Sequence, residues 1–275
     1  MGSFTFNGIT STSVGIQVAH PPMYIYPEKD YEAVHVPGRN GDIIIDQGSY
    51  KNVPRSYEIT VYDVNQPDLA YSERMVKLSN WLHSASGYAK LSDTYDAGYF
   101  RLARYYEQTQ EIENILNQGG TGEIEFDCRP ERFLDSGAET ITINRASSGT
   151  SSGILKNPTQ YASKPYIRIV GTTGSGSSAG SLTGTLRFNN QGTGVYNVFT
   201  ITGASVTGGT PEVIIDSDLQ IVTSNSEASF TYTLYEGFPT LPPPDQTISN
   251  KNITVSWLSS SNFTLVEVIP RWYII

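Results

Sequence analysis

The sequence predicts a mainly β protein, with a β-rich α+β N-terminal half that carries one helix and a β-sandwich in the C-terminal half. Three observations lead to this fold class. The 275 residues include 18 Tyr and 25 Gly and are rich in Ser and Thr, a composition typical of sheets joined by tight turns. Only one segment has apolar residues at helical spacing. Elsewhere, short runs alternate apolar and polar side chains, as in strands with one exposed face.

Charge is distributed unevenly and divides the chain into two expected domains. Residues 1–135 hold 11 Lys and Arg against 19 Asp and Glu, a net charge of −8, whereas the whole chain carries −9. Beyond this point come stretches of Ser, Thr and Gly, such as 147–153 and 171–178, which we expect to form loops. We therefore predict an N-terminal domain over residues 1–137 and a C-terminal domain over residues 138–275, each of ordinary size.

The one predicted helix lies in the N-terminal half. It is expected to begin after an N-cap at Asp68, to have His83 at its end and to stop by Gly87. Its apolar face is formed by residues at helical spacing, namely Tyr71, Met75, Leu78 and Leu82.

Two alternating segments in the same half, residues 57–62 and 123–129, predict strands with one wet face. Asn117–Gly122, which precedes the second strand, is expected to be a hairpin connection.

The C-terminal half shows seven short apolar segments separated by polar turns, which is typical of a β-sandwich. The predicted strands are Tyr166–Val170, Thr185–Phe188, Tyr196–Thr202, Val213–Ile215, Phe230–Tyr235, Asn252–Trp257 and Phe263–Ile269.

Several classes of protein are excluded at this level. No apolar run approaches the roughly 20 residues that span a bilayer, so no membrane insertion is expected. The N-terminus has no secretory signal, and we expect a soluble protein made in the cytoplasm. The single Cys128 excludes an internal disulfide, and the acidic balance provides no basic face for nucleic acid.

The sequence offers no catalytic, metal or cofactor site. Its three histidines lack metal-ligand spacing, and Cys128 is expected to be a buried structural thiol. Asp93 and Asp96 could form a carboxylate pair for acid–base chemistry, but Asp, Ser and Gly between strands more commonly make turns. Residues 216–218 begin like a calcium loop but lack the Gly and Glu that should follow. We expect a protein without enzymatic activity, with a cell-wall hydrolase left as an open alternative.

A second alternative is a carbohydrate-binding module that contacts a cell surface. It depends on aromatic side chains that could stack on sugars or on other proteins, namely Tyr95, Tyr99, Tyr105, Tyr106, Tyr196 and Tyr235.

One segment is unusual for a generic sandwich. Val36–Asp42 reads as a tight turn with two glycines, an Asn able to adopt positive φ, and an Arg at its tip. With its surroundings, this segment resembles the N-terminal domain of the phage distal tail protein (Dit) family. The motifs that carry the resemblance occur in order along nearly the whole chain. They are Phe6–Ile9, Gly15–Val18, Val36–Asp42, Gly48–Asn52, Leu91–Asp93, Tyr99–Arg104, Phe126–Phe133, Lys164–Ile169, Val213–Ser217, Phe238–Leu241 and Ile269–Trp272.

The resemblance implies a structural protein of the siphophage virion. Members of the family form a homohexameric ring, or hub, at the tail tip, which joins the tail tube to the tail-associated, fibre or receptor-binding proteins of the baseplate. The ring surrounds a channel through which DNA only passes, and the tape measure protein is a further expected partner. The N-terminal domain builds the ring, and the C-terminal domain is a galectin-like β-sandwich. The phage tail would be assembled in the cytoplasm of the bacterial host.

Two points concern particular residues. Where the family often has a Gly-Asn pair after its Phe-Pro-x-Leu motif, this chain has Pro242–Asp245, so that loop is expected to differ in shape. The candidate interface residues are Arg39, Asn40, Tyr95 and Tyr99. Arg39 either bridges two protomers or holds its own turn, and we favour the interface because a guanidinium at a rigid turn is well placed for paired hydrogen bonds.

Overall fold

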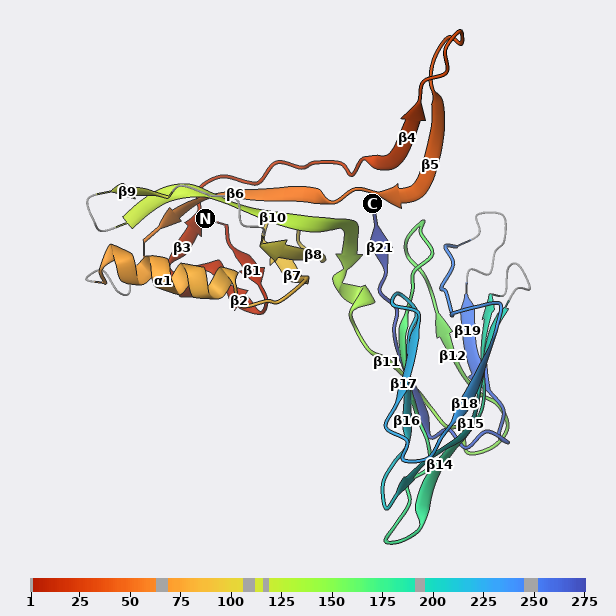
Figure 1. Ribbon diagram of the computed structural model, residues 1–275. Helices are drawn as coiled ribbons and strands as arrows, with labels where there is room; N and C mark the ends of the chain where they lie inside the picture. Colours follow the sequence, from red (N-terminus) through yellow and green to blue (C-terminus); the bar gives the residue numbers. More distant parts are fainter. Residues whose placement is uncertain (1, 63–68, 106–111, 116–118, 191–195, 245–251) are drawn as a thin grey trace. The chain divides into compact units, whose positions relative to one another are not determined.

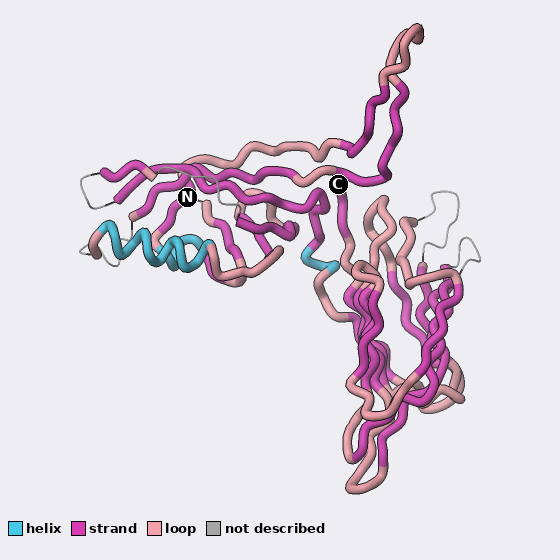
Figure 2. Tube along the Cα trace, in the orientation of Figure 1, coloured by secondary structure: helices cyan, strands magenta, loops and turns pink. Residues whose placement is uncertain are grey.

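The computed structural model describes residues 2–62, 69–105, 112–115, 119–190, 196–244 and 252–275. The described residues are mainly strand (Figure 2), so the predicted fold class is confirmed. The chain separates into two compact units, one formed by Met1–Phe133 with Ile275 and the other by Leu134–Ile274.

The first unit is built on one sheet with the strand order β2-β1-β7-β8-β10-β6-β3, and β9 also pairs with β10 (Figure 1). Its strands are β1 (Phe4–Phe6), β2 (Ile9–Thr10), β3 (Ile16–Val18), β6 (Val53–Val61), β7 (Ala89–Asp93), β8 (Tyr99–Tyr105), β9 (Glu113–Ile115) and β10 (Gly119–Leu134). A short 3₁₀ turn, η1 (Ser11–Val14), lies between β2 and β3. The strands β4 (Lys29–Val34) and β5 (Ile43–Tyr50) form a separate two-stranded sheet.

The core of this unit lies on one face of the sheet, where the predicted alternation is confirmed. The apolar residues of segments 57–61 and 123–129 are buried, while their polar neighbours are more exposed. The two segments are paired in the antiparallel strands β6 and β10, with Ile124 opposite Tyr57. A cluster of aromatic rings closes the core, because Phe4 stacks on Tyr57 with their ring centroids 4.3 Å apart.

Helix α1 (Tyr71–Leu82) packs on this core and is the only α-helix among the described residues. The indole Nε1–H of Trp81 donates a hydrogen bond of 3.1 Å to the carbonyl oxygen of Phe6. The proposed N-cap Asp68 lies outside the described residues. The helix has His83 at its end, as predicted, because His83 is its C-cap and the His83 ring forms a 2.8 Å hydrogen bond with the Ser79 carbonyl oxygen, so the helix stops ahead of Gly87.

The predicted hairpin is present, because β9 and β10 pair antiparallel with Ile115 opposite Gly119, but its connection is shorter than expected, since Gly119–Gly122 belong to β10. Residues 117 and 118 lie outside the described residues. Gly119 and Gly120 are required by close packing rather than by a turn. A Cβ atom on Gly120 would lie 2.5 Å from the carbonyl oxygen of Glu113 in the neighbouring β9.

The second unit is a sandwich of two five-stranded sheets, with strand orders β11-β20-β13-β16-β17 and β12-β19-β14-β15-β18. Apolar side chains of both sheets form one core, which includes Ile167, Phe199, Val255 and Trp257. The strands are β11 (Ile141–Asn144), β12 (Ser151–Leu155), β13 (Tyr166–Val170), β14 (Ala179–Asn190), β15 (Tyr196–Thr207), β16 (Glu212–Asp216), β17 (Ile221–Ser224), β18 (Thr231–Tyr235), β19 (Ile253–Trp257) and β20 (Leu265–Ile269). The unit also includes a 3₁₀ turn, η2 (Asp135–Gly137), and the terminal strand β21 (Tyr273–Ile274).

All seven predicted strands of this half are present, whereas β11, β12, β17 and β21 are additional. The expectation of a loop at residues 147–153 is partly wrong, because β12 begins at Ser151. This strand is specified by its partner β19, in which Trp257 lies opposite Ser151. At Gly153 a Cβ atom would lie 2.6 Å from the side chain of Ile143, so glycine is required here for packing.

Arg168 joins three neighbouring strands of the sandwich through its guanidinium. Its Nε donates to Glu212 on β16 over 2.9 Å, and its Nη1 donates to Glu267 on β20 over 2.7 Å. The hydrogen bond from Arg168 lowers the pKa of the Glu212 carboxyl, with burial acting in the opposite direction.

A carboxyl group whose pKa is lower in the folded state stabilises the fold above its unfolded pKa, and this stability is lost as the pH falls through the folded value. We therefore expect Arg168→Met to destabilise the sandwich by about 1 kcal/mol at neutral pH. Its acid unfolding midpoint should also move to higher pH. Tryptophan fluorescence during acid titration measures both effects, and an unchanged acid midpoint would contradict the assigned role of Arg168.

Candidate interaction surface

An exposed arm is the most unusual feature of the first unit. We define the arm as residues 23–50, which comprise an extended segment, the strands β4 and β5, and the turn between them (Figure 1). Of the twenty exposed large hydrophobic side chains among the described residues, nine lie in this arm. They are Met23, Tyr24, Ile25, Tyr26, Tyr31, Val34, Ile43, Ile44 and Ile45. So dense an apolar surface is typical of a region that binds another protein.

Both faces of the β4–β5 hairpin are apolar and both are exposed. Val34 lies opposite Ile43, and Ala33 lies opposite Ile44 on the other face. The side chain of Ile44 is 58% exposed and that of Tyr31 is 54% exposed. A two-stranded hairpin without a covering layer is only marginally stable in water. The apolar side chains of the arm are therefore left uncovered by the described residues of its own unit.

The turn at the end of the arm contains two of the predicted interface residues, Arg39 and Asn40, which are both exposed. Gly38 and Gly41 have φ angles of 82° and 79°, which confirms the glycine-dependent turn, but Asn40 does not adopt positive φ. The backbone N–H of Arg39 donates to the carbonyl of Val36 over 3.1 Å. The Arg39 guanidinium has no hydrogen bond or ion pair with any described residue, so nothing there shows it holding its own turn.

The base of the arm is attached to a cluster of charged residues at the β7–β8 hairpin. Arg55 donates a hydrogen bond of 3.2 Å to the carbonyl oxygen of Met23. Arg132 donates one of 2.8 Å to the Tyr24 hydroxyl, and its guanidinium lies over the Tyr24 ring, 5.0 Å from the centroid. We call this group, with Tyr57, Asp93, Asp96, Tyr99 and Arg101, the anchor cluster.

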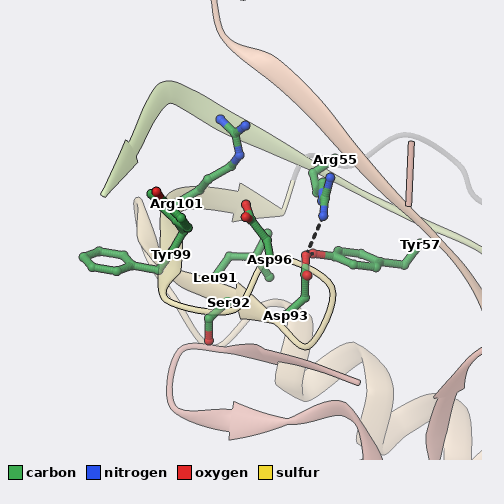
Figure 3. A pocket seen from close by; sticks show the side chains of 9 residues that line it. Arg55, Tyr57, Leu91, Ser92, Asp93, Asp96, Tyr99 and Arg101 are labelled. Atoms are coloured by element: carbon green, nitrogen blue, oxygen red, sulfur yellow. Dashed lines mark hydrogen bonds and ion pairs between the residues drawn. The ribbon is translucent and has the colours of Figure 1, made fainter. Parts of the chain in front are cut away.

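A buried ion pair lies at the centre of the anchor cluster. Arg55 and Asp93 are 2.7 Å apart, with side chains only 9% and 5% exposed (Figure 3). The Tyr57 hydroxyl donates to the same Asp93 oxygen over 2.7 Å. Burial, together with the nearby Asp93 charge, raises the pKa of Tyr57, which therefore stays protonated and donates. The backbone N–H of Tyr95 donates to the second Asp93 oxygen over 2.9 Å, which confirms that Asp93 shapes a turn.

The other two predicted interface residues, Tyr95 and Tyr99, belong to this hairpin. Tyr95 is 39% exposed, and Tyr99 is half-buried beneath Arg132, whose guanidinium lies 4.5 Å from the ring centroid. Arg132 also forms a charged hydrogen-bonded pair with Asp96. The structure thus brings Tyr95 and Tyr99 together at the anchor cluster and places Arg39 and Asn40 in the turn of the arm.

Several residues of the anchor cluster were not predicted from the sequence. Arg55, Tyr57 and Arg132 reach Asp93 and Asp96 from strands far away in the chain, so no local motif marks them. The sequence feature that could have indicated the cluster is Arg55. It lies on the apolar face of an alternating strand, where a charged side chain requires a partner.

Of the aromatic residues considered for sugar binding, Tyr105 packs against the core of the first unit and Tyr235 on β18 is 59% exposed. Tyr106 and the side chain of Tyr196 lie outside the described residues.

Cys128 is fully buried on the core face of β10, as predicted, and its pKa is raised to about 12 by desolvation. We expect its thiol to be inert in the folded protein. At pH 8 a thiol of this pKa is ionised to only about one part in 10⁴. Alkylation by iodoacetamide at pH 8, followed by mass spectrometry, should therefore be at least about 100-fold slower than in denaturant. Rapid labelling of the native protein would show that this core is open.

Neither a metal centre nor a membrane span is found in the described part of the chain. No group of three or more His, Cys, Asp or Glu side chains there could hold a metal ion. Within the same residues, no helix combines the length and apolar character needed to cross a bilayer. Residues 216–218 do not bind calcium in this arrangement, because Asp216 forms a two-point ion pair with Arg271 and accepts backbone hydrogen bonds from residues 218 and 219.

The fold of this chain, a sheet-and-helix unit followed by a two-sheet sandwich, is shared with a solved phage tail hub protein. The chain has the fold of the SPP1 Dit (gp19.1) protein, a paradigm of the hub adsorption apparatus in phages that infect Gram-positive bacteria. The TM-score is 0.59 at 14% sequence identity, and the match covers 98% of both chains.

A component of the phage p2 baseplate in its activated conformation is similar with a TM-score of 0.50, at 10% identity, over 98% of this chain and 97% of that one. No protein-family model and no curated protein matches the sequence.

Proposed function

We propose that this chain is a distal tail protein, a structural component of the virion that forms a homohexameric hub at the tip of a siphophage tail and has no enzymatic activity. The observation that carries the proposal is the exposed arm in a chain that shares the Dit fold over 98% of its length. An apolar surface on both faces of a hairpin needs a protein partner, and a second copy of the same chain is the partner that a ring provides.

The arm could provide one of the two surfaces that a ring-forming contact requires. A cyclic assembly uses head-to-tail contacts, in which one surface of each protomer meets a different surface of the next. Here the arm would be one surface, and the complementary surface would lie on the neighbouring first unit. Arg39 in the turn of the arm has no partner among the described residues and would find a carboxylate or carbonyl acceptor there.

In this proposal residues 1–137 form the ring, and residues 138–275 form an outer galectin-like sandwich. The net charge of −8 on residues 1–135 would give the channel a surface that does not retain DNA during its passage. A basic channel in the assembled ring would contradict this part of the proposal.

The remaining partners follow from position at the tail tip. The tail tube protein and the tape measure protein would meet one side of the ring, and the tail-associated, fibre or receptor-binding proteins would meet the other. The ring would be assembled in the bacterial cytoplasm and would remain in the virion.

The decisive experiment is negative-stain electron microscopy of the purified full-length protein, combined with light scattering. A hexamer has six times the 30.2 kDa protomer mass, about 181 kDa, and should appear as a six-fold ring with a central hole. A monomer at every concentration and ionic strength would reject the proposal, and so would a closed dimer.

A further inference from the structure

Arg101 is a buried arginine for which the described residues of the first unit supply no counter-charge. It stands on β8, where its register partner is Leu91 of β7, and it is only 7% exposed. Its Nη1 donates a hydrogen bond of 3.3 Å to the carbonyl oxygen of Pro130. No carboxylate of the described residues lies within the 4.0 Å ion-pairing distance of its guanidinium.

The charges around Arg101 do not balance. Arg55 pairs with Asp93, and Arg132 pairs with Asp96, so both carboxylates of the cluster are already used. Three guanidinium groups therefore face two carboxylates, which leaves a formal charge of +1 in a largely buried place. An isolated buried charge costs several kcal/mol unless it is paired. Desolvation and repulsion from Arg132 and Arg55 lower the pKa of Arg101, consistent with a missing anion.

A pocket opens beside this charge. Its lining includes Arg55, Ser92, Asp96, Tyr99 and Arg101, and Figure 3 shows the guanidinium groups of Arg55 and Arg101 on the same side of the β7–β8 hairpin. The cavity volume is about 10 Å³, which is room for about one water-sized group. One oxygen of a carboxylate fits that space, while the rest of the group would remain in the open mouth. The Nε and Nη2 of Arg101 form no other hydrogen bond to the described residues and are available as donors.

We propose that Arg101 forms the centre of a carboxylate-binding site at the anchor cluster. The carboxylate has two possible sources, a small carboxylate in solution or an acidic side chain of a second copy of this chain. In the second case the inference rests on the proposed ring. The arm offers such side chains, because Asp30 and Glu32 have no ion pair among the described residues. Either source would neutralise the third guanidinium by charge-assisted hydrogen bonds.

The first test uses the protomer, held as a monomer by the arm substitution Ile44→Asp, so that its outcome does not depend on a ring. Thermal unfolding is followed at constant ionic strength while sodium acetate replaces sodium methanesulfonate, whose sulfonate oxygens are much weaker hydrogen-bond acceptors than those of a carboxylate. A site with a Kd of about 30 mM predicts that 0.1 M acetate raises the Tm of the first unit by about 3 °C. Adding Arg101→Met should abolish this rise. The control Arg104→Met, which removes an exposed arginine of the same strand, should preserve it.

The second test uses the full chain without the arm substitution. If another copy supplies the carboxylate, Arg101→Met should raise the concentration at which half of the protein is assembled by at least about tenfold. Arg104→Met should change it little. Loss of assembly without an acetate response assigns the site to a second copy, and an acetate response without loss of assembly assigns it to a free carboxylate. If Arg101→Met changes neither the acetate response nor assembly, the site does not exist.

The melting temperature without acetate shows whether each variant folds. Met fills a volume close to that of Arg and removes an unpaired buried charge, so Arg101→Met should melt within a few degrees of its parent. Should it fail to fold, Arg101→Lys keeps the charge but loses the two-pronged geometry, and it should bind acetate several-fold more weakly. An acetate response of Arg101→Lys equal to that of its parent would overturn the assignment.

Discussion

Ile44→Asp is expected to convert the assembled protein into a 30.2 kDa monomer while leaving its fold intact. Ile44 is 58% exposed on β5 of the arm, so its substitution removes no core packing from the protomer. In a ring that buries the arm, the same change would place an unpaired carboxylate in an apolar interface. Such a contact loses about 2 kcal/mol or more, or roughly a thirtyfold weakening at every interface of the ring.

The control for this substitution is Ile154→Asp in the sandwich. Ile154 is 59% exposed, almost the same as Ile44, but it lies on β12 outside the arm. It should leave the mass at about 181 kDa, six times that of the protomer. Light scattering of both variants at equal concentration makes the comparison. Equal assembly of the two variants would show that the arm is not the ring contact.

Asp93→Asn is expected to produce the largest loss of stability of any single substitution in the anchor cluster. Asp93 accepts hydrogen bonds from Arg55 and Tyr57, and its side chain is only 5% exposed. Asparagine keeps the shape but removes the charge, so the Arg55 guanidinium is left buried without a counter-charge. Breaking a buried pair in this way costs about 3–5 kcal/mol, which corresponds to a fall in Tm of about 10–20 °C for the first unit.

Differential scanning calorimetry measures this loss of stability, and a control at an exposed ion pair distinguishes it from the loss of a surface charge. The matched control is Asp218→Asn, which removes the partner of Lys164 in a pair whose side chains are 25% and 52% exposed. Its cost should not exceed about 1 kcal/mol, because exposed ion pairs contribute little. If Asp93→Asn were as mild as this control, the anchor cluster would not hold the base of the arm.

The parts of the fold that could be predicted from the sequence are those with regular periods. The helical spacing from Tyr71 to Leu82 and the alternation at Ile124, Phe126 and Cys128 each reflect burial of one face, and burial leaves a local pattern. Strands such as β12 could not be predicted, because Ser151 and Gly153 carry no strand preference. They become a strand through pairing with β19 and through the space that Ile143 occupies.

The candidate site was predicted only in fragments for a related reason. The VPGRNGD turn was recognised, but the strands on both sides of it were not, because their apolar residues serve two exposed faces rather than one buried face. The resemblance to the Dit family identified the fold without indicating which side chains meet. Arg55 and Asp93 lie 38 positions apart, and Arg132 and Tyr24 lie 108 apart. Such pairs are created by the sheet and have no signature in the linear sequence.

The three consecutive isoleucines of β5 make the newly made protein prone to aggregation. Ile43, Ile44 and Ile45 are exposed in the free protomer, and a short β-branched run on an unprotected strand is the kind of segment that seeds aggregation. Asp42 and Asp46 flank this run, and flanking charges slow such self-association. In the proposed ring, these two aspartates would protect the strand from self-association until a partner covers it. Replacing both Asp42 and Asp46 with asparagine should therefore lower the yield of soluble protein. It should have less effect on the assembly of the protein that stays soluble.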